Sequence, residues 1–184
     1  MTSACVVRRI ALAAAFTAAA LTCAPPASAE TTEQEKSQVL SLANPFRSIY
    51  SAEPLVWGDA LSAGAEQAAK ACEEVAPEEG GGQITFWTAG GKDNRTAIKE
   101  AFQGWKNERT HYTPENPVFS AAYDGFTQLV WKSSTHINVA VAQCPAGSLA
   151  SFATTHVVAR FSPAGNVKGK FRLNVHVPQD GDAV

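Results

Sequence analysis

The chain's first apolar pattern after residue 30 has helical spacing. Thr32 and Glu35 form a Thr-x-x-Glu pair that resembles a capping box, which is typical of a helix start. Apolar residues then recur at intervals of three and four: Val39, Leu42, Phe46 and Ile49. Pro45 lies inside this pattern and either kinks the helix or starts a second one at Phe46.

Two further stretches predict helices. Residues 59–75 place Leu61, Ala65, Ala68 and Cys72 on one face of an alanine-rich helix. Residues 83–87 lie between two segments rich in glycine and proline or alanine, and they predict a short β-like segment. A third helix begins after a cap at Asn94 or Thr96, and its apolar face lies at spacings i, i+3, i+4 and i+7: Ile98, Ala101, Phe102 and Trp105.

The last third of the chain changes to a period of two. Four β-branched or aromatic runs between turn signals predict strands: residues 126–131, 137–142, 155–161 and 170–177. In the last run apolar and polar residues alternate, and residues 162–166 before it predict a hairpin loop. Helices followed by antiparallel strands indicate an α+β fold in one domain.

The N-terminus predicts a secretory signal peptide over residues 1–29. Arg8 and Arg9 precede the apolar run 10–21, and Ala27-Ser28-Ala29 fits a small-x-small cleavage site. The mature domain would span residues 30–184 and be secreted to the extracellular space. The apolar run is too short for a membrane anchor, and no later stretch approaches about 20 apolar residues, so we expect no transmembrane helix.

Cleavage simplifies the charge and the cysteine count. Without Arg8 and Arg9 the mature chain has 13 basic and 17 acidic residues, a net charge of −4, which does not favour nucleic acid as a partner. Cys5 and Cys23 leave with the signal, so the remaining Cys72 and Cys144 predict one disulfide in an oxidising compartment. Asn94-Arg95-Thr96 is an N-glycosylation sequon, which implies a surface loop.

Five motifs in order resemble the CAP superfamily of cysteine-rich secretory, antigen 5 and pathogenesis-related proteins. They begin with Asn44-x-x-Arg47 and Pro54-Leu55-Val56-Trp57, continue with Trp105-x-x-Glu108-x-x-x-Tyr112 and the Phe-Thr-Gln segment at 126–128, and end with Phe161-x-Pro-x-Gly-Asn166. The resemblance implies a three-layer α-β-α sandwich with a mostly antiparallel central sheet, and it also implies the Cys72–Cys144 bridge. Many members carry a second cysteine pair, at positions that correspond here to Val139 and Ala159.

The family's cleft commonly holds two histidines and two glutamates, which bind zinc in some members. The resemblance maps these four positions onto Ala43, Gln83, Glu108 and Gly125. Ala and Gly cannot ligate a metal and Gln is a poor ligand, so we expect a vestigial cleft with no metal site and no cofactor. An alternative is that Glu108 and His111, at i and i+3, form half of a replacement metal site.

The remaining histidines and three of the tryptophans are predicted to have structural rather than functional roles. His136, His156 and His176 are expected at the surface or at strand edges. Three tryptophans are expected to anchor the core: Trp57, Trp105 and Trp131. Trp87 fits no periodic pattern and is the one expected to line a groove.

The loop after the third helix carries a hint of function. Sterol-binding fungal members have an aromatic-x-aromatic-x4-aromatic loop here, and this chain has Tyr112, Pro114 and Phe119 at the three positions. These residues are the predicted ligand-binding set, although Pro114 replaces the central aromatic. The other interpretation is a rigid, proline-broken loop with two buried aromatic ends.

The sequence thus predicts a secreted, non-enzymatic, monomeric CAP-domain protein that binds a small apolar ligand, a sterol or a fatty acid, in a surface loop pocket. A second hypothesis is recognition of an extracellular protein, as in an effector or a defence-related protein. A third is a metal-dependent hydrolase, against which Ala43 and Gly125 argue.

Overall fold

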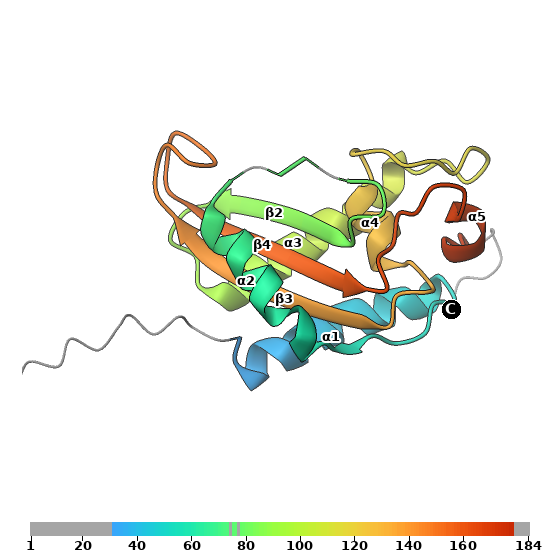
Figure 1. Cartoon of the computed structure of the whole chain (residues 1–184), viewed down its shortest axis with the longest axis horizontal. Coiled ribbons are helices and arrows are strands. Elements are labelled where there is room, and N and C mark those ends of the chain that lie inside the picture. Colours follow the sequence, from blue (N-terminus) through green and yellow to red (C-terminus); the bar gives the residue numbers. More distant parts are fainter. Residues whose placement is uncertain (1–30, 74, 77, 179–184) are drawn as a thin grey trace, which may run out of the picture.

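A computed structural model describes residues 31–73, 75–76 and 78–178, so the expected signal peptide lies outside the described residues. Four strands form one sheet in the order β1-β3-β4-β2 (Figure 1). β3 (His136–Cys144) and β2 (Gln83–Ala89) flank β4 (Thr154–Ser162) in antiparallel pairings. β1 (Val56–Trp57) joins β3 in parallel. The expected α+β fold with a mostly antiparallel sheet is confirmed.

Helices cover both faces of this sheet, as expected for an α-β-α sandwich. Alternate residues of β3 and β4 point to opposite faces. Val139, Val157 and Ala159 pack in the main core with α1 (Glu33–Ile49) and α3 (Asn94–Asn107). On the other face Ala140 and Val158 pack against α2 (Ser62–Ala71), which Figure 1 shows crossing β3 and β4.

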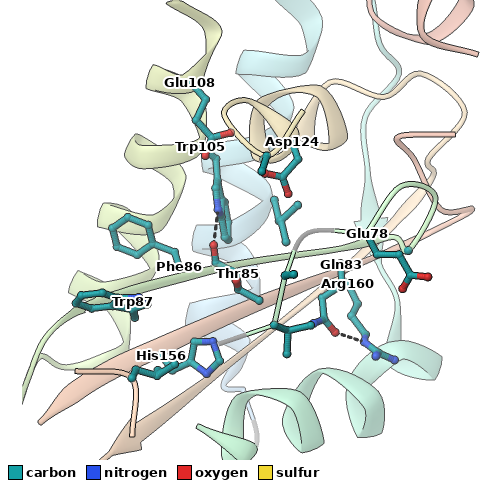
Figure 2. Close-up of a pocket in the computed structure, with 17 residues that line it drawn as sticks. Glu78, Gln83, Thr85, Phe86, Trp87, Trp105, Glu108, Asp124, His156 and Arg160 are labelled. Carbon is teal, nitrogen blue, oxygen red and sulfur yellow. Dashed lines mark hydrogen bonds between the residues drawn. The ribbon is translucent and has the colours of Figure 1, made fainter. Parts of the chain in front are cut away.

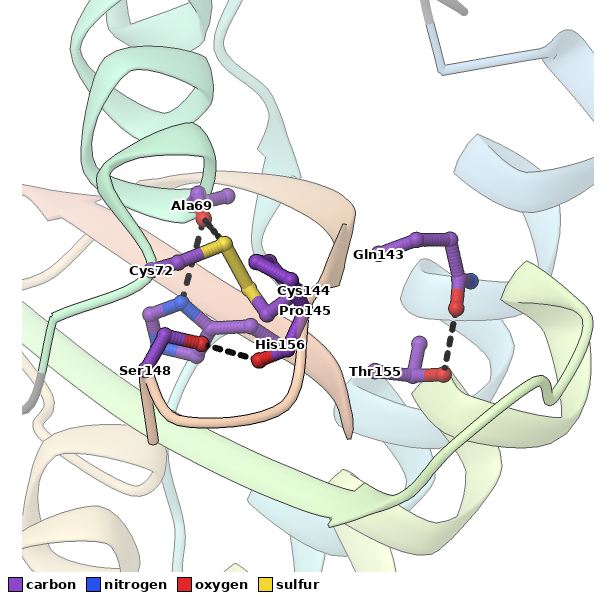
Figure 3. Close-up of a disulfide and its surroundings, with 8 residues drawn as sticks. All are labelled: Ala69, Cys72, Gln143, Cys144, Pro145, Ser148, Thr155 and His156. Carbon is purple, nitrogen blue, oxygen red and sulfur yellow. Dashed lines mark hydrogen bonds between the residues drawn. A yellow bond between two sulfur atoms is a disulfide. The ribbon is translucent and has the colours of Figure 1, made fainter. Parts of the chain in front are cut away.

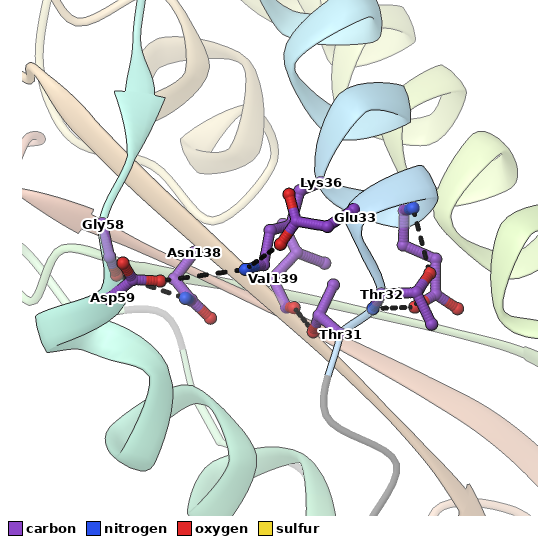
Figure 4. Close-up of polar contacts among 9 residues, drawn as sticks. Thr31, Thr32, Glu33, Lys36, Gly58, Asp59, Asn138 and Val139 are labelled. Atoms are coloured by element: carbon purple, nitrogen blue, oxygen red, sulfur yellow. Dashed lines mark hydrogen bonds and ion pairs between the residues drawn. The ribbon is translucent and has the colours of Figure 1, made fainter.

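The start of α1 has the expected capping box. The Thr32 hydroxyl accepts the Glu35 N–H, and the Glu35 carboxylate accepts the Thr32 N–H at 2.7 Å. Pro45 lies inside one continuous helix, so a second helix starting at Phe46 is wrong. The Thr31 hydroxyl donates to the Val139 carbonyl at 2.9 Å, which ties the chain ahead of α1 to β3 (Figure 4).

The other helix boundaries differ from the predicted ones. The stretch 59–75 forms a 3-10 turn, η1 (Asp59–Leu61), and then α2, which ends where Cys72 adopts a left-handed conformation at φ 51°. The N-cap of α3 is Asp93 rather than Asn94 or Thr96, and its carboxylate accepts the Thr96 N–H at 3.0 Å. A second 3-10 turn, η2 (Glu108–His111), follows α3 directly.

Two of the predicted strands are wrong. Residues 126–131 contribute to the helix α4 (Asp124–Leu129), in which all six residues are buried. Residues 170–177 contain the short helix α5 (Phe171–Asn174) followed by irregular chain, so residues 162–166 are not a hairpin loop. The strand predictions at 83–87, 137–142 and 155–161 are confirmed.

The disulfide prediction is confirmed. Cys72 at the end of α2 bonds Cys144 at the end of β3, with 5.6 Å between their Cα atoms (Figure 3). Val139 and Ala159, where many relatives carry a second pair, are direct cross-strand partners with no exposed surface. Apolar packing between β3 and β4 therefore occupies the place of that bridge.

Candidate functional site

A cleft of about 500 Å³ lies along β2 and reaches from β4 to the junction of α3 with α4 (Figure 2). Its lining is mixed, with carboxylates, aromatic rings, an amide and a guanidinium. The side chains with the most bearing on its chemistry are Gln83, Thr85, Trp87, Trp105, Glu108 and Asp124. Three of the four positions that the resemblance assigned to the cleft do lie there: Gln83, Glu108 and Gly125.

Ala43 does not belong to this cleft, and its assignment is wrong. It lies on the buried face of α1, one turn after Val39 and one turn before Arg47. Its side chain is fully buried in the main core, and it is not among the residues that line the cleft.

Glu108 stands where α3 ends, and its carboxylate turns toward the start of α4. Its Oε2 atom accepts the backbone N–H of Phe126 at 2.9 Å. Burial raises the pKa of Glu108 to about 7, and the nearby Asp124 carboxylate raises it as well, against the lowering effect of the Phe126 and Gly125 N–H groups. Glu108 therefore stabilises the first turn of α4 and stays partly protonated near neutral pH.

Gly125 leaves the room that this contact needs. A Cβ atom added to Gly125 would collide with Cδ1 of Trp105 and would lie 2.8 and 2.9 Å from the two carboxylate oxygens of Glu108. Trp105 is itself fixed, because its indole N–H donates to the Thr85 carbonyl at 3.2 Å and its side chain is buried. A histidine at this position therefore does not fit this arrangement of Trp105 and Glu108.

Asp124 is a cleft residue that sequence reasoning missed. Its residue is 8% exposed, and burial raises the pKa of its carboxyl to about 6, although the backbone N–H groups of Asp124 and Gly125 lower it. The available signal was an acid immediately before the Gly-Phe-Thr-Gln segment, where a first helical turn favours negative charge. Because residues 126–131 were expected to form a strand, Asp124 was not recognised as the first residue of a helix.

At the other side of the cleft, polar side chains from β2 and β4 pair with each other. The Arg160 Nε–H donates to the Gln83 side-chain oxygen at 2.9 Å, and these residues are cross-strand partners. The end of the Arg160 guanidinium lies against Gly64 of α2. Trp87, 39% exposed, lines the cleft as expected, and its ring contacts that of Phe152 with 6.3 Å between centroids.

His156 is buried, so its expected surface position is wrong. It is 1% exposed on β4, and its Nδ1 atom lies 3.2 Å from the Ala69 carbonyl, beside the disulfide (Figure 3). Burial lowers its pKa, which favours the neutral ring in the cleft that it lines. His136 and His176 are exposed, as expected.

The predicted loop set is not gathered around the cleft. Tyr112 is buried in a second aromatic cluster, where its ring lies 5.4 Å from that of Tyr123, and burial raises its pKa to about 12. Phe119 is half-buried against the same cluster, and Pro114 is exposed. The loop therefore has one buried aromatic end, Tyr112, and one half-buried end, Phe119, where the rigid-loop interpretation expects two buried ends.

The sequon lies at a helix start rather than in the expected loop. Asn94 is the first residue of α3 and is half-buried. The Thr96 hydroxyl of the sequon donates to the Asp93 carboxylate at 2.7 Å.

The part of the chain that the structure describes contains no group of three or more His, Cys, Asp or Glu side chains able to hold a metal ion. His111, which with Glu108 would form half of a replacement metal site, is exposed and does not line the cleft. Within the same ranges no helix is long and apolar enough to cross a membrane.

Comparisons with known proteins agree with this architecture. The model of the cysteine-rich secretory protein family, CAP, matches residues 40–161. The Golgi-associated plant pathogenesis-related protein 1 of Homo sapiens is 30% identical over 154 residues, which cover 80% of this chain and 96% of that protein. Pathogenesis-related protein 1C of Nicotiana tabacum is 29% identical over 75% of this chain and 80% of that protein.

Among solved structures, the hookworm platelet inhibitor superposes with a TM-score of 0.65 at 19% identity, over 81% of this chain and 80% of that one. This likeness concerns the fold alone. The family match begins inside α1 and continues to the last residues of β4, and it includes the helix α4 beside the cleft. The chain therefore belongs to the CAP family of cysteine-rich secretory proteins.

Proposed function

We propose that this chain is a secreted, non-catalytic recognition protein that binds an extracellular protein partner in the cleft along β2. The observation that carries the proposal is the cleft itself, which presents a 39% exposed tryptophan, Trp87. The residues at the positions where family members carry the histidines and glutamates contact other parts of this chain instead. The family is that of the cysteine-rich secretory proteins, and two of the relatives are named as pathogenesis-related proteins, which supports a secreted, defence-related class of function.

The contacts of the cleft residues favour binding over catalysis. The Glu108 carboxylate holds the start of α4, Gln83 holds Arg160, and Gly125 has no side chain and no room for one. A general acid or base must reach its substrate within hydrogen-bond distance. Glu108 holds the Phe126 N–H through Oε2, so Oε1 is the oxygen left to face a ligand.

Secretion is part of the proposal. The Cys72–Cys144 bridge persists in oxidising compartments, and cytosolic reductants would open it. Mass spectrometry of the protein from its culture medium or extracellular fluid tests this point. A mature N-terminus at Glu30 supports secretion, and retention of residues 1–29 inside cells contradicts it.

The test of the recognition function uses two aromatic-to-alanine variants as matched probes. Mature protein, residues 30–184, is immobilised as wild type, as Trp87→Ala and as Phe119→Ala, and is incubated with extracellular extracts. We expect a partner that wild type and Phe119→Ala retain and that Trp87→Ala loses. A retained protein that Trp87→Ala binds equally well would remove the cleft from the proposal.

A small apolar ligand at the loop remains a second proposal, and the surface beside that loop favours it. Val118 is 49% exposed, and Phe119 next to it is only partly buried, so a sterol or fatty acid has apolar surface to contact there. The proposed contacts are Tyr112 at the base, Phe119 at the side and Pro114 at the exposed rim.

The same proteins test this second proposal with labelled cholesterol, ergosterol and palmitate, and with zinc titrated in parallel. Saturable lipid binding that Phe119→Ala loses and Trp87→Ala keeps would support the loop. Lipid binding that only Trp87→Ala loses would assign the lipid to the cleft. Hydrolytic turnover that a chelator abolishes would contradict the non-catalytic proposal.

A further inference from the structure

We propose that the cleft takes a positively charged side chain of its protein partner, with the ammonium or guanidinium group against Glu108 and Asp124 and the apolar stem toward Trp87. This inference rests on the proposed recognition function and names the chemistry of the partner. Three features of the cleft carry it: its anionic end, the placement of its own positive charge, and its apolar wall.

The anionic end consists of two carboxylates with little access to water. Asp124, only 8% exposed, lines the cleft, and no side chain of the described part of the chain donates a hydrogen bond to its carboxylate. Asp124 lies close enough to Glu108 for its carboxylate to raise the pKa of Glu108. Backbone N–H groups are the hydrogen-bond partners of these carboxylates, and a ligand cation would further offset the cost of burying their charge.

The chain places its own positive charge elsewhere. Within residues 31–73, 75–76 and 78–178 no ion pair is formed to Glu108 or Asp124. Among the described residues Arg160 is the one cation that lines the cleft, but Gln83 holds it and its guanidinium points toward α2, away from both carboxylates (Figure 2). Lys106, on α3 just before Glu108, lies instead over the Phe46 ring.

The other titratable groups do not oppose a cation at this end. His156 lines the cleft from β4, and burial favours its neutral form. Glu78, from the connection between α2 and β2, adds a further negative charge at the rim. The described titratable groups of the cleft therefore place no positive charge against Glu108 and Asp124, and charge complementarity with a partner suppresses wrong partners and speeds association.

The wall along β2 suits the stem of a lysine or arginine. Phe86 and Trp87 line the cleft from consecutive positions of β2, and Trp87 contacts Phe152 at the outer end. Lysine and arginine bury their methylene stems against apolar surface while the charged end seeks a polar group. A partner side chain that lies along the edge of β2 therefore has apolar rings beside its stem, Trp87 on one face of the strand and Phe86 on the other.

The test uses N-acetyl amides of lysine, arginine and norleucine as probes, followed in ¹H–¹⁵N NMR spectra of residues 30–184. Norleucine has the lysine stem without the charge. We expect the lysine and arginine probes to shift the Gly125 amide and the Trp87 indole signals, and to bind about tenfold more tightly than norleucine, because hydrogen bonds to charged groups are the stronger ones. Added salt should weaken only the two charged probes.

Two neutralising variants make the test specific. Asp124→Asn should bind lysine about tenfold more weakly. Glu33→Gln makes the same change of charge at a side chain 87% exposed on α1, outside the cleft, and should bind it as wild type does. A folded Asp124→Asn protein with unchanged affinity would overturn the inference, as would zinc or calcium shifting the same signals while lysine does not.

The remaining outcomes separate this inference from the recognition function. Norleucine binding as tightly as lysine overturns the charged-group inference and leaves recognition in the cleft intact. No shift from any of the three probes at 20 mM, a concentration on the order of weak fragment affinities, also overturns it. A captured partner that Trp87→Ala binds equally well removes the cleft from the recognition proposal, and with it the site to which this inference assigns the charged group.

Discussion

At the residue scale, the cleft depends on Gly125, because the Glu108 carboxylate and the Trp105 ring occupy the space that a side chain at position 125 would need. In Gly125→Ala the new methyl group would collide with Trp105 and crowd Glu108. Because overpacking a well-filled site typically costs about 1–3 kcal/mol, we expect a loss of that size in the free energy of unfolding, measured in urea. Gly81→Ala is the matched control, since its nearest neighbour is the exposed Glu78 side chain and the loss should be small.

The same crowding predicts that a histidine cannot simply be restored at position 125. Gly125→His should lose at least as much stability as Gly125→Ala and should gain no zinc affinity, as measured by calorimetry. A stable variant that binds zinc would show that α4 can shift away from Trp105, and the steric role assigned to Gly125 would then be wrong.

Glu108 makes stability depend on pH in the direction opposite to a salt-bridged acid. Its pKa is raised from 4.5 to about 7 in the folded chain, so the folded state holds a proton that the unfolded state has lost. Its contribution to stability is therefore greatest below pH 4.5 and falls as the pH rises toward 7. Asp124, with its pKa raised from 3.8 to about 6, acts in the same direction at lower pH.

Glu108→Gln isolates this effect, because glutamine can still accept the Phe126 N–H but does not titrate. Relative to wild type, the variant should gain unfolding free energy between pH 5 and pH 8, on the order of 2 kcal/mol. Urea unfolding of both proteins at several pH values measures the difference. A difference that stays constant over this range would mean that Glu108 titrates normally.

At the element scale, α1 and the chain after α4 are joined through one buried cation. Arg47 has no exposed surface, and burial lowers its pKa to about 10. Its guanidinium donates to the carbonyls of Leu129 at 2.7 Å, Trp131 at 3.1 Å and Ser134 at 2.9 Å. These carbonyls end α4 and lead into β3, so Arg47 fixes the segment that carries the cleft helix.

Arg47→Met keeps the stem and removes all of these donors. We expect it to lower the free energy of unfolding by about 3 kcal/mol, the range for breaking a buried charged contact, because several buried carbonyls lose their partners. Arg95→Met is the control, since Arg95 is exposed near the start of α3 and its loss should change stability little. Equal thermal midpoints for the two variants would contradict the role assigned to Arg47.

Element boundaries also show where sequence patterns stop being informative. The helical spacing of apolar residues predicted α1, α2 and α3, because each of these helices has one solvent-exposed face. All residues of α4 are buried, so apolar and polar positions do not alternate with a helical period there. In residues 170–177 the alternation of apolar and polar residues wrongly predicted a strand. The buried residues there are Phe171, Asn174 and Val175, at helical spacing, whereas Leu173 is 74% exposed. Glu108 could be placed in the cleft from its motif, but Asp124 could not, because its position depends on the α4 start.

At the scale of the whole molecule, the two helical layers are attached unequally. α1 and α3 bury large side chains such as Phe102 and Trp105 against the sheet, whereas α2 offers mainly Ala65 and Ala69 to Ala140 and Val158. Since stabilisation scales with the apolar area removed from water, α2 gains little from packing. The Cys72–Cys144 bridge, at the end of α2, is therefore expected to hold this layer in place.

The double variant Cys72→Ser/Cys144→Ser tests this asymmetry. The bridge spans 72 residues of sequence, so its loss should lower the free energy of unfolding by about 2–4 kcal/mol. Hydrogen exchange should rise more in α2 than in α3, because α2 loses its covalent tie and keeps only a small apolar contact. Wild type reduced with dithiothreitol is the control and should show the same pattern. If exchange rose equally in both helices, the bridge would stabilise the whole domain rather than the layer that contains α2.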